Sequence, residues 1–164
     1  MADDALKKIQ LQQIHKLCLN RSLTIAVAES ITGGRLQAAL TSTSGASRYF
    51  LGGVTAYNID QKVNLLGVDR EHAEVVNCVS EQVVKQMVTG VRKLFGADIG
   101  LATTGYAEAW PEGNVTRPFA FFAIGNAGNM MVERVAIENR SRIDAQKLIV
   151  DQVVKSLDEF LIEN

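Results

Sequence analysis

Small polar residues that follow an apolar run are the first candidates for chemistry in this chain. The run 23–28 is followed by one acid, two hydroxyl residues and two glycines: Glu29, Ser30, Thr32, Gly33 and Gly34. A strand that ends in this way and turns directly into a helix presents side-chain oxygens and free backbone N–H groups at the carboxyl edge of a sheet. Open α/β sheets bind ligands at that edge. An N-cap followed by a tight turn is the commoner use of such residues.

A serine nucleophile needs a base, and neither histidine is well placed to serve Ser30. His15 lies inside an amphipathic helical pattern, His72 lies in a charged connector, and no G-x-S-x-G elbow is present. The remaining option is Lys62, which lies among apolar residues of a short helical segment. Because the ordinary pKa of lysine is about 10.4, a lysine neutral near pH 7 must favour the neutral form by roughly 4.6 kcal/mol, which burial can supply. A solvated helical lysine is the usual alternative, and spacing alone does not separate the two.

Length and composition indicate one soluble intracellular domain. The chain has 164 residues, 47% hydrophobic content, two prolines and a net charge of −1, so no electrostatic feature favours nucleic-acid binding. No apolar run approaches the ~20 residues of a membrane span, and the acidic N-terminus lacks the features of a signal peptide. Cys18 and Cys78 have no metal-ligand spacing. We therefore expect a single cytoplasmic domain over 1–164, with no metal site and no membrane contact.

Helical and strand patterns alternate along the chain, which predicts an α/β fold. Helices are expected over 3–19, 35–40, 58–67, 80–96 and from Ser141 onward, and strands over 23–27, 49–57, 98–103, 118–124 and 130–137. This order predicts a three-layer α/β/α sandwich with a mixed, mostly parallel sheet and an antiparallel edge hairpin. A bend or bulge is expected at Gly52–Gly53, a charged connector at 69–72 and a loop at 106–117.

Two surfaces are assigned from the same patterns. The first helix is expected to bury a stripe of Leu6, Ile9, Gln13 and Leu17, widened by Ile14 and Cys18. The apolar residues 119–122 fit either a core strand or an edge strand used in a homo-oligomer, and composition does not decide between these alternatives.

The residues around Ser30 and Lys62 resemble the CinA C-terminal domain family, and the resemblance extends along nearly the whole chain. The motifs that carry it are A-E-S-x-T-G-G over 28–34, G-A-S-x-Y-F-x-G-G-V-x-A-Y-N over 45–58, Lys62 with L-L-G-V over 65–68, V-S-E over 79–81, and G-A-D-x-G-L-A over 96–102 with T-G at 104–105. Members stand alone or follow a molybdopterin-binding-like domain, and we expect the stand-alone form here. The family includes nicotinamide-nucleotide amidohydrolases, which deamidate nicotinamide mononucleotide (NMN).

The resemblance implies a Ser/Lys hydrolase that converts NMN to nicotinic acid mononucleotide and ammonia. It assigns Ser30 as nucleophile, Lys62 as base and Tyr57 as an assisting residue. It implies a substrate site formed by Glu29, Thr32, Gly33, Gly34, Thr104, Gly105 and Arg140. Backbone N–H groups at the Gly33–Gly34 helix start would stabilise the oxyanion, and the reaction needs neither metal nor cofactor. The expected partner is a small-molecule nucleotide or amide.

The chain departs from the family pattern after Gly105. The family's T-G-I-A-G-P-x-G-G reads T-G-Y-A-E-A-W-P-E-G over 104–113, and its K-P-V-G reads R-P-F-A over 117–120. Glu108 and Trp110 add charge and bulk beside the expected phosphate position, and we expect one of them to occupy part of the pocket. Smaller departures are Ile31 in place of Cys, V-N-C-V-S over 76–80 in place of H-G-A-V-S, and Asp144 where the second Arg of G-D-R-x-x-x-R would fall.

These departures leave three functions open. The chain deamidates NMN, hydrolyses another small amide, or binds a small ligand or protein partner without catalysis. Ser30, Tyr57 and Lys62 favour the first two, whereas Glu108 and Trp110 favour the last two.

Overall fold

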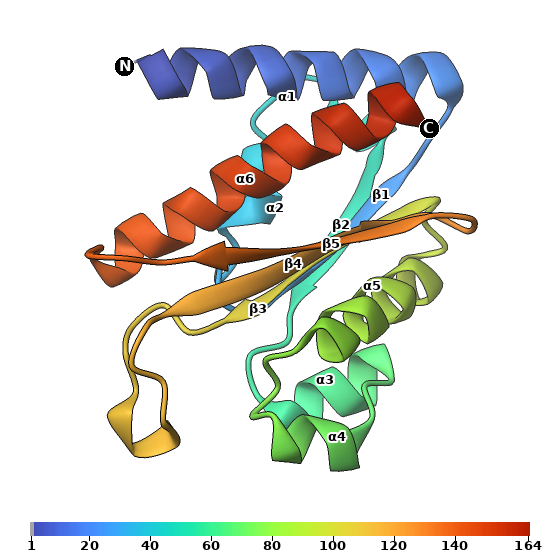
Figure 1. Cartoon of the computed structure of the whole chain (residues 1–164). Helices are drawn as coiled ribbons and strands as arrows, with labels where there is room; N and C mark the ends of the chain where they lie inside the picture. The colour runs from blue at the N-terminus through green and yellow to red at the C-terminus, as the bar shows by residue number, and fades with distance from the viewer. Residues whose placement is uncertain (1) are drawn as a thin grey trace.

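The computed structural model describes residues 2–164, and the strands in this part of the chain form one mixed sheet between two layers of helices (Figure 1). The strand order is β2-β1-β3-β4-β5. Strands β2, β1 and β3 are parallel, and β4 runs antiparallel to both β3 and β5. The predicted mixed sheet with an antiparallel edge hairpin is confirmed. The strands are β1 (Ile25–Glu29), β2 (Phe50–Thr55), β3 (Ile99–Gly105), β4 (Phe119–Gly125) and β5 (Met130–Ala136).

Helices cover both faces of the sheet, as the predicted sandwich requires. One layer contains α1 (Ala2–Arg21), α2 (Arg35–Leu40) and α6 (Arg142–Glu163), and the other contains α3 (Ile59–Leu66), α4 (Arg70–Val75) and α5 (Glu81–Phe95) (Figure 1). Short 3-10 turns occur at Ala46–Arg48 and Pro111–Gly113. Within residues 2–164, no helix is both long enough and apolar enough to cross a membrane.

Strand β1 lies at the centre of the fold because both of its faces are apolar. Ile25 and Val27 pack in the core beneath α1, α2 and α6, whereas Ala26 and Ala28 pack in the core beneath α5. All five residues of the strand are buried. The near-continuous apolar run in the sequence therefore reflects alternation between two cores, as expected for a central parallel strand.

The expected irregularity in β2 is confirmed. The pairing register of β1 with β2 shifts between Ile25, which lies opposite Phe50, and Ala26, which lies opposite Gly52. Leu51 is thus the additional residue of a bulge, and Gly52 has a φ of 150°. The bulge bends β2 before it delivers the segment 56–58 to the site.

The expected stripe of helix α1 is partly wrong. Leu6 and Ile9 are 56% and 58% exposed, and the buried residues of this helix are Leu11, Ile14 and Cys18. The buried stripe lies one residue further along the helix than the predicted one. The prediction was misplaced because Leu6 and Ile9 are apolar although they lie on the solvent side.

The expected connector at 69–72 is also wrong, because this segment begins helix α4. Asp69 is the N-cap, and its side chain accepts a hydrogen bond from the backbone N–H of His72 at 3.3 Å. Ala73 is the buried residue of this six-residue helix. So short a helix, with one buried position, shows no helical periodicity in its sequence.

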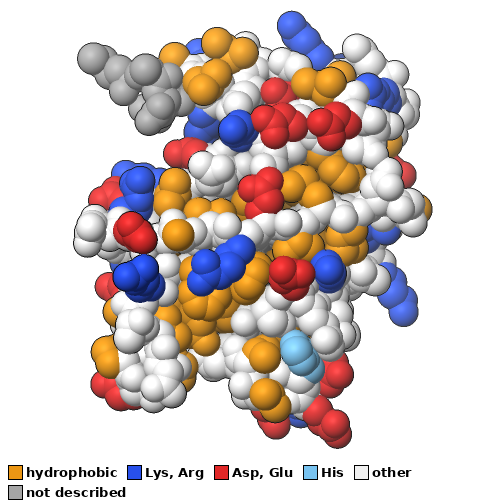
Figure 2. Space-filling view, viewed as in Figure 1, with side chains coloured by type: hydrophobic (Ala, Val, Ile, Leu, Met, Phe, Trp, Pro, Cys, Tyr) orange, Lys and Arg blue, Asp and Glu red, His pale blue; other side chains and the backbone are white. Residues whose placement is uncertain are grey.

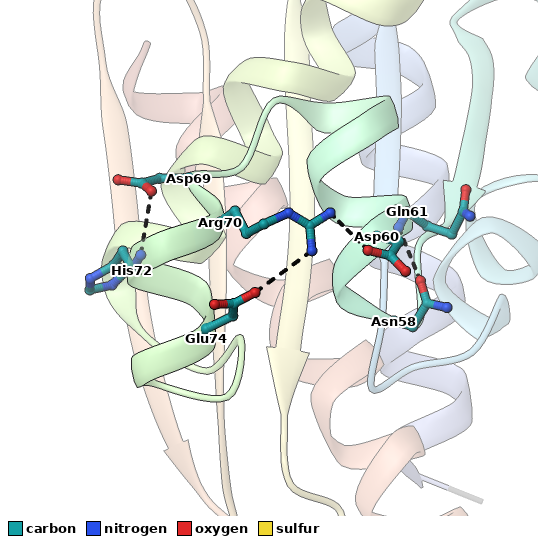
Figure 3. A network of polar contacts seen from close by, with 7 residues as sticks. All are labelled: Asn58, Asp60, Gln61, Asp69, Arg70, His72 and Glu74. Carbon is teal, nitrogen blue, oxygen red and sulfur yellow. Dashed lines mark hydrogen bonds and ion pairs between the residues drawn. The ribbon is translucent and has the colours of Figure 1, made fainter.

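Polar contacts join α4 to α3, the helix that carries Lys62 (Figure 3). Arg70 Nη2 lies 2.8 Å from Asp60 Oδ1, and Arg70 Nη1 lies 3.8 Å from Glu74 Oε1. Asn58 caps α3 by accepting from the backbone N–H of Gln61 at 3.0 Å. Of these contacts, the Arg70–Asp60 pair bridges the two helices, and an exposed ion pair of this kind contributes little energy.

Candidate active site

A cavity of about 690 Å³ opens at the carboxyl ends of β1 and β3. The chain leaves the carboxyl end of β1 toward α2 on one face of the sheet and leaves the carboxyl end of the neighbouring β2 toward α3 on the other face. Crevices form where connections diverge in this way, and ligands of open α/β sheets bind there. Side chains from both sides of the crevice line the cavity, among them Ser30, Tyr57, Lys62, Glu74, Cys78, Thr104, Glu108, Trp110 and Arg142.

The space-filling view shows the hollow from outside. Figure 2 shows two lobes below β5, with hydrophobic side chains gathered between them. The segment after β3 forms one lobe, and α3 with α4 forms the other (Figure 1). The cavity draws its lining from both segments, 104–110 and 57–79.

Ser30 and Lys62 meet inside this cavity. Lys62 Nζ lies 2.9 Å from Ser30 Oγ, and the two side chains come from the turn after β1 and the middle of α3. Both residues are buried, Lys62 with 1% and Ser30 with 8% of its surface exposed. The geometry expected of a serine with a lysine base is therefore present.

Two backbone carbonyl oxygens lie beside the Lys62 amine, in addition to the hydroxyl of Ser30. Nζ lies 2.8 Å from the carbonyl oxygen of Ala56 and 3.1 Å from that of Tyr57. A neutral amine donates its two N–H groups to these carbonyls and keeps its lone pair for the hydroxyl of Ser30. Within residues 2–164, Lys62 forms no ion pair with a carboxylate. Burial lowers the pKa of Lys62 below its ordinary value, and the nearby thiol of Cys78 opposes this effect to a smaller extent.

Glu29 is not in the cavity, contrary to its expected role as a substrate ligand. Its buried carboxylate accepts hydrogen bonds from three backbone N–H groups at the start of α2: Gly34 at 3.0 Å, Leu36 at 3.0 Å and Gln37 at 2.8 Å. This carboxylate satisfies donors that a helix start otherwise leaves free. Glu29 therefore builds the turn that holds Ser30, and the start of α2 is not available to an anion.

Thr32, Gly33 and Gly34 do not line the cavity either. Thr32 is fully buried, and its Oγ1 lies 2.8 Å from Oγ1 of Thr103. Gly33 and Gly34 have φ values of 59° and 96°, which a side chain tolerates poorly. These residues shape the sharp turn between β1 and α2 rather than contact a ligand in the cavity.

Tyr57 contacts the dyad through its backbone. Its carbonyl oxygen faces Lys62, whereas its hydroxyl accepts a hydrogen bond from Nη2 of Arg142 at 2.6 Å. Among the described residues, its side chain makes no hydrogen bond with Ser30 or Lys62. The side chain lines the mouth of the cavity.

The arginine that lines the cavity is Arg142 and not Arg140, which the resemblance placed in the substrate site. Arg140 is exposed and does not line the cavity, whereas Arg142, the first residue of α6, does. The guanidinium of Arg142 also lies 2.8 Å from Oε2 of Glu108. The sequence contained one signal for this residue, because a cation in the first turn of a helix opposes the helix dipole and calls for a reason.

Thr104 and Gly105 line the cavity. Thr104 Oγ1 donates to the carbonyl oxygen of Cys78 at 2.7 Å. This bond holds two consecutive residues, Asn77 and Cys78, in the left-handed region with φ values of 48° and 62°. Strained backbone of this kind concentrates at functional sites. Asn77 and Cys78 also line the cavity, although no motif in the sequence indicated a site role for either residue.

Aromatic side chains position the loop after β3. The ring of Tyr106 lies 6.1 Å from that of Trp110 and 5.6 Å from that of Phe119. Trp110 pairs through its backbone with Val115, which closes the loop on itself. Both Glu108 and Trp110 line the cavity, in agreement with the expectation that one of them occupies part of the pocket.

Other parts of the described chain offer less for chemistry. A groove of about 700 Å³ between α1, α2 and α6 is lined by exposed or half-buried lysines and hydroxyl groups, without a buried base beside a nucleophile. No group of three or more His, Cys, Asp or Glu side chains within residues 2–164 is arranged to hold a metal ion.

Comparisons with known proteins agree with the architecture and the motifs. The model of the CinA C-terminal domain matches residues 7–161. The chain is 39% identical to a CinA-like protein of Prochlorococcus marinus over 98% of its own length and 37% of that protein. It is 44% identical to a CinA-like protein of Chlorobium limicola over 71% of its length and 27% of that protein. The chain thus spans about a third of the length of these relatives.

Solved structures show the same fold. A competence-damaged protein (CinA) superfamily protein from Klebsiella pneumoniae superposes with a TM-score of 0.88 at 28% identity, over 96% of this chain and 99% of that one. A competence or damage-inducible protein from Enterobacter asburiae gives a TM-score of 0.85 at 26% identity, over 93% and 96% of the two chains. From the sequence match and the shared fold together, this chain belongs to the CinA C-terminal domain family.

Proposed function

We propose that this protein is an amidohydrolase that uses Ser30 as nucleophile and Lys62 as base, acting on a primary carboxamide such as that of NMN. The observation that carries the proposal is the 2.9 Å separation of Ser30 Oγ and Lys62 Nζ in a buried setting. When the amine is neutral, its two N–H groups can donate to these carbonyl oxygens, which leaves its lone pair to accept the proton of Ser30. Burial that lowers the pKa of Lys62 supports the same role.

In the proposed reaction, the Ser30 hydroxyl proton passes to Lys62 Nζ as Oγ bonds to the carboxamide carbon. The C–N bond then breaks, and the lysine ammonium returns the proton to the departing nitrogen, which leaves as ammonia. Water attacks the acyl-serine ester with Lys62 again as base, and the carboxylic acid is released. Each half of the reaction returns Ser30 and Lys62 to their starting protonation states.

The oxyanion needs hydrogen-bond donors, and the donors expected at Gly33–Gly34 are not free. Glu29 holds the N–H of Gly34, and the N–H of Gly33 donates to the carbonyl oxygen of Ser30 at 3.1 Å. The backbone N–H of Ile31, the residue after the nucleophile, makes no hydrogen bond within the described residues, and Ile31 lines the cavity. We assign it as the oxyanion donor, since the residue after a nucleophilic serine supplies such a donor in other hydrolases.

Ammonia release from NMN tests the proposal. We expect the purified protein to release ammonia and both Ser30→Ala and Lys62→Met to reduce kcat by about 10²- to 10⁴-fold. Lys85→Met removes an exposed lysine of α5 and serves as the matched control, with unchanged activity expected. Circular dichroism of each variant checks that the fold is retained. Equal background rates from the wild type and both dyad variants would overturn the proposal for this substrate.

A non-catalytic role is the second candidate, and Glu108 and Trp110 in the cavity lining favour it. Their bulk and charge reduce the room for a mononucleotide. Under this alternative, ligand binding persists in Ser30→Ala while no amide is turned over by any variant. Calorimetric titration of the wild type and Ser30→Ala with NMN, beside the ammonia assay, separates the two functions.

A further inference from the structure

Three residues from separate parts of the chain form a polar cluster in the wall of the cavity. Arg142 Nη1 lies 2.8 Å from Glu108 Oε2, and Arg142 Nη2 lies 2.6 Å from the hydroxyl oxygen of Tyr57. The three residues come from the start of α6, the loop after β3 and the segment after β2, and all line the cavity. The cluster therefore joins the elements on either side of the dyad.

The charges of the cavity lining do not favour an anion. Its ionisable cations are Lys62 and Arg142, and its carboxylates are Glu74 and Glu108. With Lys62 neutral, as its role as base requires, one cation faces two carboxylates. Each carboxylate is already paired with an arginine: Glu74 lies 3.8 Å from the exposed Arg70, and Glu108 binds the guanidinium of Arg142. A phosphate ester thus meets no free cation among the lining residues that the structure describes.

Aromatic rings face the same space. Tyr57, Tyr106 and Trp110 all line the cavity, and Trp110 is 41% exposed. Aromatic faces attract planar rings that carry positive charge. A pyridinium carboxamide without a phosphate matches the aromatic rings and the charge of this lining.

We propose that Glu108 makes the site select carboxamides that carry no phosphate, because its carboxylate occupies the one guanidinium that a phosphate would bind. This inference rests on the proposed function, in that it names the substrate class of the same site. A phosphate-bearing substrate has to displace Glu108 from Arg142 and then remain close to the displaced carboxylate. The ion pair is half exposed, with side-chain exposures of 48% for Arg142 and 61% for Glu108. A phosphate can therefore displace Glu108, but the displacement lowers the affinity for the phosphate-bearing substrate.

The magnitude follows from the two contributions. Breaking an exposed ion pair lowers affinity by up to about fivefold, and the remaining repulsion between carboxylate and phosphate adds a further factor of similar size or smaller. We therefore expect Glu108 to reduce kcat/KM for a phosphate-bearing substrate by about tenfold relative to the same substrate without phosphate.

A matched pair of substrates isolates this effect. NMN and nicotinamide riboside share the reacting amide, the pyridinium ring and the ribose, and differ in the phosphate. We expect the wild type to prefer the riboside, and Glu108→Ala to raise kcat/KM for NMN about tenfold while leaving the riboside within about twofold. Glu112→Ala removes a carboxylate from the same loop that is exposed and outside the cavity lining, and it should change neither substrate. Adding Arg142→Ala to Glu108→Ala should abolish the gain for NMN.

Several outcomes would overturn the inference. These are a wild type that prefers NMN, a Glu108→Ala variant that changes both substrates equally or neither, and a gain that survives Arg142→Ala. If neither amide is hydrolysed, the proposed function fails, and calorimetric Kd values for the same two compounds then test the inference separately. It is upheld if Glu108→Ala tightens NMN alone by about tenfold. It is overturned if the ratio of the two Kd values stays unchanged or neither compound binds.

Discussion

Replacing Glu29 by alanine tests whether its carboxylate builds the start of α2 or binds substrate. The carboxylate is fully buried and accepts three backbone hydrogen bonds, from Gly34, Leu36 and Gln37. Hydrogen bonds to a charged group contribute about 1.5–3 kcal/mol each, which gives a gross loss of roughly 4.5–9 kcal/mol. The bonds share one acceptor, and water enters the vacated space, so we expect a net loss of about 3–5 kcal/mol in the free energy of unfolding.

Urea unfolding followed by circular dichroism measures this loss. Glu29→Gln keeps the shape and one carbonyl oxygen but points an amide N–H₂ at backbone donors, so we expect an intermediate loss of about 2–3 kcal/mol. Glu81→Ala removes an exposed first-turn carboxylate from α5, and its effect should stay within about 0.5 kcal/mol. These values compare with a total stability of about 5–15 kcal/mol for a typical domain, so the alanine variant is expected to unfold at markedly lower urea concentrations.

The opposite result identifies a substrate ligand. If Glu29→Ala changed the free energy of unfolding by less than about 1 kcal/mol while raising KM for a carboxamide, the carboxylate would be contacting substrate, and the account of the helix start would be wrong. A structural role instead lowers stability first and lowers kcat through the displaced Ser30.

Three further predictions concern the elements around the dyad. Activity should rise with pH, because the neutral amine of Lys62 is the active form. Burial lowers the pKa of Lys62, so the midpoint of the kcat/KM profile should lie below the ordinary lysine value of about 10.4. A profile without this rise from about pH 6 to 10 would contradict Lys62 as base. Gly90→Ala should destabilise the protein by about 1–3 kcal/mol in urea unfolding, although alanine favours helices, because its Cβ would lie 2.0 Å from the carbonyl oxygen of Leu66. Thr89→Ala is the neutral control, and equal stabilities of Gly90→Ala and the wild type would refute the contact. Asp69→Ala should cost about 1 kcal/mol of stability through the lost cap of α4 and leave kcat unchanged, and a loss of kcat alone would contradict this structural role.

The sequence predicted the parts of the fold that depend on local pattern. The apolar run before Ser30, the helical patterns over 58–67 and 80–96 and the hairpin strands over 118–124 and 130–137 are local patterns, and the structure contains the elements they indicate. Helix α4 was missed because its six residues, R-E-H-A-E-V, bury a single position, Ala73, and so provide no periodic signal. Local rules work where local contacts decide the structure.

The site depended on contacts that local rules do not reach. Ser30 and Lys62 are separated by 32 residues, and no spacing rule places the middle of α3 beneath the turn after β1. The resemblance to the CinA family supplied that pairing. It did not supply Arg142, because the contact with Glu108 joins two stretches where this chain differs from the family pattern. A resemblance predicts the positions that follow the pattern and gives no information on partners that replaced it.

The two buried ionisable groups beside Ser30, Glu29 and Lys62, differ from the Arg142–Glu108 pair in how strongly the fold depends on them. Backbone N–H groups surround the carboxylate of Glu29, and backbone carbonyl oxygens surround the amine of Lys62. Neither group has a charged side-chain partner in the described ion pairs, so each depends on backbone dipoles. A substitution of either side chain leaves these backbone groups in place and without their partner. The pair of Arg142 and Glu108 is side chain to side chain and half exposed, so it changes at little cost in stability. We therefore expect substitutions of Arg142 or Glu108 to lower the free energy of unfolding less than substitutions of Glu29 or Lys62.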